Sequence, residues 1–173
     1  MKVIAFAASS SRHSINKQLV SYACGLLPNA QVTVLDLNDF ELPLFSEDRE
    51  KELGHPQLAQ DFFALLGSAD ALVISFAEHN GSYTAAYKNL FDWTSRINPK
   101  VFQGKPVIAL ATSPGAGGAA SVLATAVKSM PYFGGEVKGQ FSLPAFNDNF
   151  DRTQGCVKPG PLADQLAATM AML

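Results

Sequence analysis

Five short strand-like segments, each followed by a segment of helical periodicity, constrain this chain more than any other feature. The segments cover residues 2–8, 31–37, 71–76, 106–112 and 136–143. The first is a continuous apolar run, which is typical of a strand that is covered on both faces, as in a parallel sheet. Apolar residues spaced three and four apart predict helices over residues 14–27, 56–67, 84–97, 119–133 and 161–173. The alternation predicts a doubly wound α/β fold, with a five-stranded parallel sheet, right-handed crossovers and helices on both faces.

The size of the chain predicts one domain over residues 1–173. Hydrophobic residues make up 47% and charged residues 16%, a balance that favours a packed protein over a disordered one. Two longer segments, 38–55 and 144–160, lack a clear period and are rich in Pro, Gly and charge. Because long loops in compact domains are often functional, we expect these segments to form a rim or a lid.

Charge and hydropathy exclude several kinds of partner. Thirteen Lys and Arg against 15 Asp and Glu give a formal net charge of −2, without a basic stripe for nucleic acid. The apolar opening run stops at polar residues 9–12, which favours a first strand over a signal peptide, and no window is apolar enough for a membrane helix. We therefore expect a soluble, cytoplasmic protein. Cys24 and Cys156 share no metal or redox spacing, and reduced thiols are expected.

The loop after the first strand is rich in hydroxyl groups. In an open α/β sheet, ligands bind beyond the carboxyl ends of the strands, near the point where strand order reverses. Residues 9–16 (SSSRHSIN) lead from such an end into a helix. Free backbone amides, the helix dipole and serine hydroxyls together suit a phosphate monoester. The same run also fits a plain serine-rich turn in which Ser14 caps the helix.

The loops after the third and fourth strands suit a flat ring. Asn80-Gly81 predicts a tight turn with exposed backbone amides, and His79 or Tyr83 would lie alongside the ring, although Asn-Gly also occurs in turns of no function. In the other loop, Gly115-x-Gly117-x-x-Ala120 formally matches a dinucleotide fingerprint, with Glu136 about twenty residues further on. Glu136 begins a strand rather than ending one. The glycines therefore better fit a close approach of the backbone to a ring edge.

Together these segments resemble the NADPH-dependent FMN reductase family of flavodoxin-like proteins, which includes quinone, azo-dye and chromate reductases. The resemblance covers about residues 1–145. It rests on the following segments: Ser9…Ser14-x-Asn16, Leu42-Pro43-Leu44-Phe45, Glu78-His79-Asn80-Gly81-Ser82, Lys88-Asn89…Asp92-Trp93…Ser95-Arg96, and Lys105-Pro106…Ser113-Pro114-Gly115-x-Gly117-Gly118. It implies the strand order 2-1-3-4-5, bound FMN, and NADPH or NADH as electron donor.

The resemblance also implies a set of cofactor-binding residues. The first loop would hold the FMN phosphate, the second the flavin ring and ribityl chain, and the third would lie beside the ring. The candidates are Ser9, Ser11, Arg12, Ser14, Ile15, Asn16, Glu78, His79, Asn80, Gly81, Ser82, Ser113, Pro114 and Gly115. The chain departs from the common pattern of the family at two places. In the first loop, Ala8 replaces a glycine, and Ser11 stands at the position of an arginine, so that Arg12 follows one residue after that position. In the second loop, Ala77-Glu78-His79 replaces Pro-Glu-Tyr.

The function implied is the passage of hydride from NAD(P)H to flavin N5 and then to a small acceptor, such as a quinone, an azo compound, a metal oxyanion or free flavin. The flavin carries this chemistry, so no catalytic side chain is expected. No metal is expected either, because the three histidines lack ligand spacing. Two alternatives stay open: a flavodoxin-type electron carrier without enzymatic activity, and a nucleotide- or phosphate-binding module without redox chemistry.

Aromatic residues of the fourth predicted segment bear on assembly. Tyr87, Phe91 and Trp93 do not share one helical face, so part of this surface is expected to turn away from the core. This predicts a homodimer or tetramer in which the helix packs against its mate and the partner helps to wall the flavin pocket. The alternative is that all three side chains belong to the core of one chain.

Overall fold

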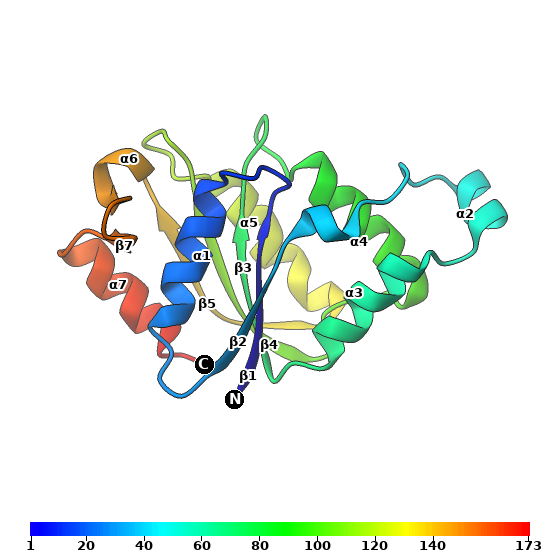
Figure 1. Cartoon of the computed structure of the whole chain (residues 1–173), viewed down its shortest axis with the longest axis horizontal. Coiled ribbons are helices and arrows are strands. Elements are labelled where there is room, and N and C mark those ends of the chain that lie inside the picture. The colour runs from blue at the N-terminus through cyan, green and yellow to red at the C-terminus, as the bar shows by residue number, and fades with distance from the viewer.

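The computed structural model describes residues 1–173 and confirms the predicted fold class. Five parallel strands form one sheet in the order β2-β1-β3-β4-β5, with helices on both faces (Figure 1). The strands are β1 (Lys2–Ala8), β2 (Gln31–Leu35), β3 (Ala71–Phe76), β4 (Lys105–Thr112) and β5 (Gly135–Leu143). The helices are α1 (Ile15–Gly25), α2 (Glu47–Leu53), α3 (Gln57–Gly67), α4 (Ala85–Ile97), α5 (Ala120–Ser129), α6 (Phe146–Asn149) and α7 (Pro161–Met170).

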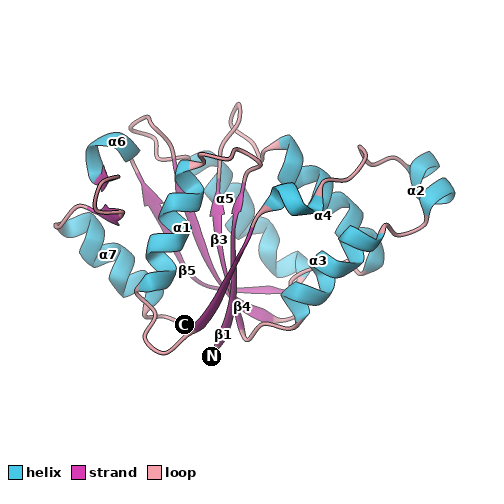
Figure 2. Ribbon diagram, viewed as in Figure 1, coloured by secondary structure: helices cyan, strands magenta, loops and turns pink.

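Alternate residues of the central strands divide the core into two apolar layers. Val3 and Ala5 of β1 pack under α1 and α7, while Ile4 and Phe6 of the same strand pack under α3, α4 and α5. Figure 2 shows these two helical layers on either side of the sheet. Because both faces of β1, β3 and β4 are covered, nearly all of their residues are buried, which explains their continuous apolar sequences.

Short elements occupy the two segments that sequence periodicity left irregular. The 3₁₀ turn η1 (Leu37–Phe40) and α2 lie within residues 38–55, and α6 with the small hairpin β6 (Phe150–Asp151) and β7 (Cys156–Val157) lies within residues 144–160. The predicted helix 119–133 ends earlier as an α-helix and continues as the 3₁₀ turn η2 (Met130–Phe133), because Pro131 has no amide hydrogen to continue the α-helical pattern. α2 buries none of its residues and projects from the body (Figure 1).

The expectation that part of the aromatic surface of α4 turns away from the core is wrong. Tyr87 and Trp93 are buried and Phe91 packs against the core. The physical reason is that α4 is covered from two sides: Phe45, before α2, packs edge-on against Trp93, and Phe102 and Phe133 pack against Phe91. Oligomeric state therefore stays a prediction. None of the helices combines the length and apolar character that crossing a membrane requires.

Candidate functional site

A polar cavity of about 280 Å³ opens where β1, β3 and β4 end. Its walls come from the three loops that follow these strands. The lining residues are Ser9, Ser11, His13, Ser14, Ile15, Asn16, Ala77, Glu78, His79, Thr112, Ser113 and Pro114. Strand order reverses between β1 and β3, which is the position expected for a ligand in a doubly wound sheet.

The serine-rich loop presents hydrogen-bonding groups to this cavity. Ser14 caps α1, because its side chain accepts a hydrogen bond from the Lys17 amide, so the capping interpretation is confirmed. The amides of Ile15 and Asn16 precede the first hydrogen bond inside the helix and have no carbonyl partner there. Hydroxyls, free amides and the positive end of a helix dipole thus meet at one place, an arrangement suited to a phosphate group.

Asn16 lines the cavity, but its side chain ties three elements together. Its Oδ1 accepts hydrogen bonds from Ser75 Oγ at 2.8 Å and from the Thr112 amide at 3.1 Å. Its Nδ2 donates to the Thr112 carbonyl at 3.1 Å. These bonds join the start of α1 to β3 and β4 beneath the cavity. Asn16 therefore fixes the position of the serine loop, with at most one side-chain hydrogen left for a ligand.

Glu78 also positions one wall against another. Its carboxylate accepts a hydrogen bond of 2.8 Å from the Val122 amide, in the first turn of α5. No side chain of α5 caps this end, since the residue before the helix is Ala119. A carboxylate at a helix N-terminus is stabilised by the helix dipole. The Glu78 side chain thus holds the loop after β3 against α5.

The segment His79–Ser82 is a tight hairpin. Backbone hydrogen bonds join His79 and Ser82 in both directions, at 3.0 and 3.1 Å. Asn80 and Gly81 both have positive φ, at 52° and 75°, which is the geometry of a type I′ turn. The predicted turn is confirmed, and its tip, Asn80 to Ser82, lies beyond the residues that line the cavity. In Figure 1 the loop after β3 rises above the sheet edge.

The remaining predicted residues divide in two groups. Ser113 and Pro114 line the cavity, and Ser113 Oγ donates to the Gly115 carbonyl at 3.3 Å. Arg12 and Gly115 lie in the same loops but outside the lining. The structure also argues against a dinucleotide fingerprint at Gly115 and Gly117. Glu136, the acidic residue that such a fingerprint needs, is near the start of β5, exposed and ion-paired with Lys138.

Three cavity residues were not among the candidates: His13, Ala77 and Thr112. Ala77 and Thr112 stand where β3 and β4 end, so the rule that sites lie at carboxyl ends of strands could have found them. His13 lies inside the serine loop, and its position between Ser11 and Ser14 could have indicated that it lines the cavity.

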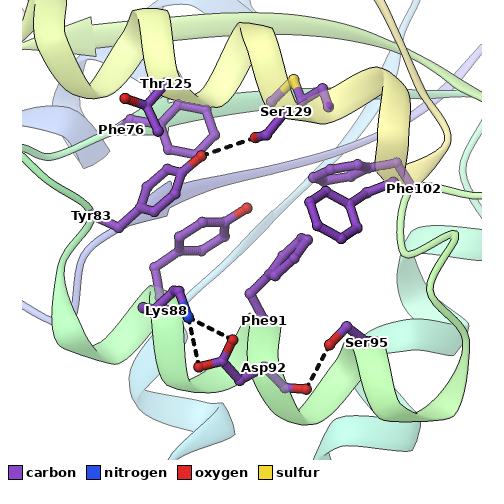
Figure 3. Close-up of a pocket in the computed structure, with 12 residues that line it drawn as sticks. Phe76, Tyr83, Lys88, Phe91, Asp92, Ser95, Phe102, Thr125 and Ser129 are labelled. Atoms are coloured by element: carbon purple, nitrogen blue, oxygen red, sulfur yellow. Dashed lines mark hydrogen bonds and ion pairs between the residues drawn. The ribbon is translucent and has the colours of Figure 1, made fainter.

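A second cavity, of about 210 Å³, has a different chemistry. It lies between α4 and α5 on the face of the sheet and is lined largely by aromatic side chains, among them Phe76, Phe91 and Phe102 (Figure 3). Tyr83 and Ser129 form a 3.3 Å hydrogen bond across it, and Lys88 pairs with Asp92 on α4. Burial raises the pKa of Tyr83 and raises that of Tyr87 further, so both phenols stay protonated at neutral pH. This cavity holds no group arranged for a phosphate.

A third cavity, of about 340 Å³, lies on the other side of the serine loop. Ser10 lines it, whereas its neighbours Ser9 and Ser11 line the polar cavity. Leu42 and Leu44 form part of its wall. Asn89 holds this segment on α4, accepting from the Phe45 amide at 2.8 Å and donating to the Leu42 and Pro43 carbonyls.

The strand order 2-1-3-4-5 and a phosphate-compatible cavity at the β1/β3 switch point define the class of flavodoxin-like proteins. Within that class, the sequence pattern of the NADPH-dependent FMN reductases matches residues 1–148. The chain belongs to this family.

Individual relatives agree with this placement. An NAD(P)H-dependent FMN reductase of Pseudomonas aeruginosa is 33% identical over 121 residues, which are 69% of this chain and 64% of that protein. An NADPH:quinone oxidoreductase of Arabidopsis thaliana is 30% identical over 125 residues, 70% of this chain and 62% of that one. The chain thus matches less than two thirds of the length of these relatives.

A solved structure shares the whole architecture. The flavoenzyme FerB of Paracoccus denitrificans, an NAD(P)H:(acceptor) oxidoreductase, superposes with a TM-score of 0.77 at 24% identity, over 98% of this chain and 93% of that one. At this level of identity the likeness shows a common fold.

Proposed function

We propose that this chain is an NAD(P)H-dependent FMN oxidoreductase that reduces a small acceptor. The observation that carries the proposal is the polar cavity at the ends of β1, β3 and β4, whose serine hydroxyls and free α1 amides fit the phosphate end of FMN. The membership in the FMN reductase family supports it. The bound flavin would accept a hydride from the reduced nicotinamide and deliver electrons to a quinone, an azo compound, a metal oxyanion or free flavin.

The chain's own residues bind and orient in this proposal. Ser9, Ser11 and Ser14 would hold the phosphate with the amides of Ile15 and Asn16. The hairpin of Asn80 and Gly81 and the loop around Gly115 would lie along the ring and ribityl chain. Asn16 and Glu78 act as positioning residues, since their side chains are bonded to other walls of the site. No side chain is required to accept a proton from the nicotinamide, because the transferred group is a hydride.

The direct test is an anaerobic titration of the FMN-loaded protein with NADPH and, separately, NADH, followed by the visible flavin absorbance. Bleaching by either donor, reversed on addition of a quinone, is the expected result and identifies the donor. Bound flavin that stays oxidised would contradict the reductase assignment and favour an electron carrier. A protein that binds no flavin would overturn the proposal as a whole.

Two neighbouring serines provide a matched test of where the phosphate binds. Ser11→Asp places a carboxylate in the polar cavity, and charge repulsion should weaken FMN binding about tenfold or more. Ser10→Asp adds the same charge to the other side of the loop and should change FMN affinity much less. Fluorescence titration of the flavin-free proteins gives both dissociation constants. Equal losses in the two variants would place the phosphate elsewhere.

We also propose a homodimer that uses the α4–α5 face. The aromatic-lined cavity between these helices opens at the surface, and Tyr132 in η2 exposes 73% of its area. A second copy of the chain would cover this apolar surface, since exposed apolar patches commonly mark interfaces. Sedimentation velocity at micromolar concentration should show a dimer. A monomer under these conditions would refute the proposal.

A further inference from the structure

The polar cavity contains no permanent positive charge. None of its twelve lining residues is a lysine or an arginine. A phosphate monoester carries a charge of about −1.5 to −2 at pH 7. Serine hydroxyls and helix amides can donate hydrogen bonds to it, but they supply only partial charges. The side chains of the lining that can become positively charged are those of His13 and His79.

The two histidines come from opposite walls. His13 lies in the serine loop, one residue before the cap of α1, and His79 begins the hairpin after β3. Two backbone hydrogen bonds to Ser82 hold His79 in place, and the bonds of Asn16 to β3 and β4 fix the loop that carries His13. His13 and His79 thus line one cavity, together with Ser9, Ser11 and Ser14.

We infer that His13 and His79 are the cationic partners of the flavin phosphate, and that they make FMN binding depend on protonation. The inference rests on the proposed function, because it assumes that the polar cavity takes the phosphate end of FMN. Imidazole changes its charge near neutral pH, and a protonated imidazole donates a charge-assisted hydrogen bond to phosphate. Riboflavin has the same ring and no phosphate, so its binding should not depend on these residues.

The other charged groups near the cavity are already engaged or lie outside it. From the loop after β3, the Glu78 carboxylate is bonded to the Val122 amide. From α1, Lys17 is paired with Asp36 at 2.5 Å. Arg12 lies in the serine loop but is not part of the lining, and the β4 loop contributes only Thr112, Ser113 and Pro114. The dependence of FMN affinity on pH is therefore assigned to the two histidines.

The test compares FMN and riboflavin binding to flavin-free protein between pH 7.0 and 8.5, by fluorescence titration. The second phosphate pKa is about 6, so the ligand keeps its charge over this range. Between pH 7.0 and 8.5, wild-type affinity for FMN should fall about three- to tenfold, while riboflavin affinity should stay constant. The variant His13→Gln/His79→Gln should bind FMN weakly already at pH 7.0 and show no further loss.

A matched control is His55→Gln. His55 lies 3.7 Å from Glu50, outside the cavity, and its loss should leave the pH dependence of wild type intact. The inference fails if wild-type FMN affinity is constant from pH 7.0 to 8.5, or if the double variant keeps the wild-type dependence. It fails separately from the proposed function, which would be overturned if neither FMN nor riboflavin bound.

Discussion

Asn16 shows how a side chain can support a binding site when nearly all of its hydrogen-bonding capacity is used within the protein. Its oxygen and nitrogen join the serine loop to β3 and β4, and it is almost fully buried. Buried polar groups are expensive to leave without partners. The resemblance to the family implies a position next to the phosphate for Asn16. The structure adds that its side chain supports the loop from below.

We expect Asn16→Ala to destabilise the fold by about 2–4 kcal/mol. The change leaves the fully buried Ser75 hydroxyl and the Thr112 amide without their shared acceptor. Urea unfolding followed by circular dichroism measures the effect. Asn147→Ala is the control, because that side chain is exposed and accepts only one surface hydrogen bond, from Arg152, and should change stability by less than about 0.5 kcal/mol. Similar values for both variants would contradict the supporting role of Asn16.

Asp36 makes part of the free energy of unfolding depend on pH. The hydrogen bond from Lys17 is the main cause that lowers its pKa to about 2, helped by the Asn38 amide. A carboxyl group whose pKa is lower in the folded state than in the unfolded one, where it is about 3.9, stabilises the fold above the unfolded value. That contribution is lost as the pH falls through the range from about 4 to 2.

Asp36→Asn should therefore be less stable than wild type at pH 6, and the difference should shrink as the pH falls from 5 towards 2. Urea unfolding at pH 6, 4 and 3 measures it. Asp39→Asn changes an exposed carboxyl group of the same 3₁₀ turn and serves as the control. A wild-type advantage over Asp36→Asn that stays constant down to pH 3 would contradict the assignment.

At the scale of elements, α4 holds the segment 42–46 in place. Asn89 makes three hydrogen bonds to its backbone, and the Trp93 indole donates to the Pro43 carbonyl at 2.7 Å. Phe45 packs edge-on against the indole, with 5.1 Å between ring centroids. This segment also walls the third cavity through Leu42 and Leu44. Residues 38–55 thus contribute to the wall of the third cavity, and their expected role as a rim or a lid of the functional site stays a prediction.

The single tryptophan makes this attachment measurable. Asn89→Ala should loosen the segment and expose Trp93, so its fluorescence emission should move to longer wavelength and its quenching by acrylamide should increase. Far-ultraviolet circular dichroism should stay close to wild type. Asn98→Ala, at the other end of α4, is the control and should leave the emission unchanged. Unchanged emission in Asn89→Ala would contradict the role of Asn89 in holding the segment.

Sequence reasoning was most successful for the elements with long, regular patterns. The five strands and the helices α1, α3, α4, α5 and α7 were predicted within a few residues. For β1, β3 and β4 the reason is that burial on both faces of a sheet leaves a continuous apolar sequence. α2 and α6 were not predicted. α2 buries no residue and α6 has only four residues, so neither has a buried face long enough to impose a period on the sequence.

The site was predictable to the level of loops and not of side chains. The three loops meet as expected, because parallel strands end at one edge of the sheet. The actual partners of Asn16 and Glu78 could not be predicted, since they lie 96 and 44 residues away in the sequence. The contact of Phe45 with Trp93 could not be predicted for the same reason. Because the aromatic side chains of α4 are covered within the chain, they no longer support a dimer.

At the scale of the whole molecule, FMN should stabilise the fold by mass action. A ligand that binds only the folded state adds about 2.7 kcal/mol at a concentration 100 times its dissociation constant. For a chain of this length that corresponds to a rise of about 5–10 °C in Tm. Differential scanning fluorimetry with FMN measures the shift, and adenosine monophosphate is a phosphate-bearing control of different ring shape. An equal rise with both ligands would contradict specific recognition of the flavin.

The projecting helix α2 is a place where the chain can be given new ends. It buries no side chain, whereas both chain ends lie at the opposite edge of the sheet from the three loops of the site (Figure 1). Exposed segments of this kind tolerate new ends. A circular permutant whose original ends are joined by a short linker and which is opened within residues 47–53 would keep every strand pairing of the sheet. In such a protein the serine loop would follow the hairpin and the start of α5 in the sequence. The three segments would still enclose the same cavity.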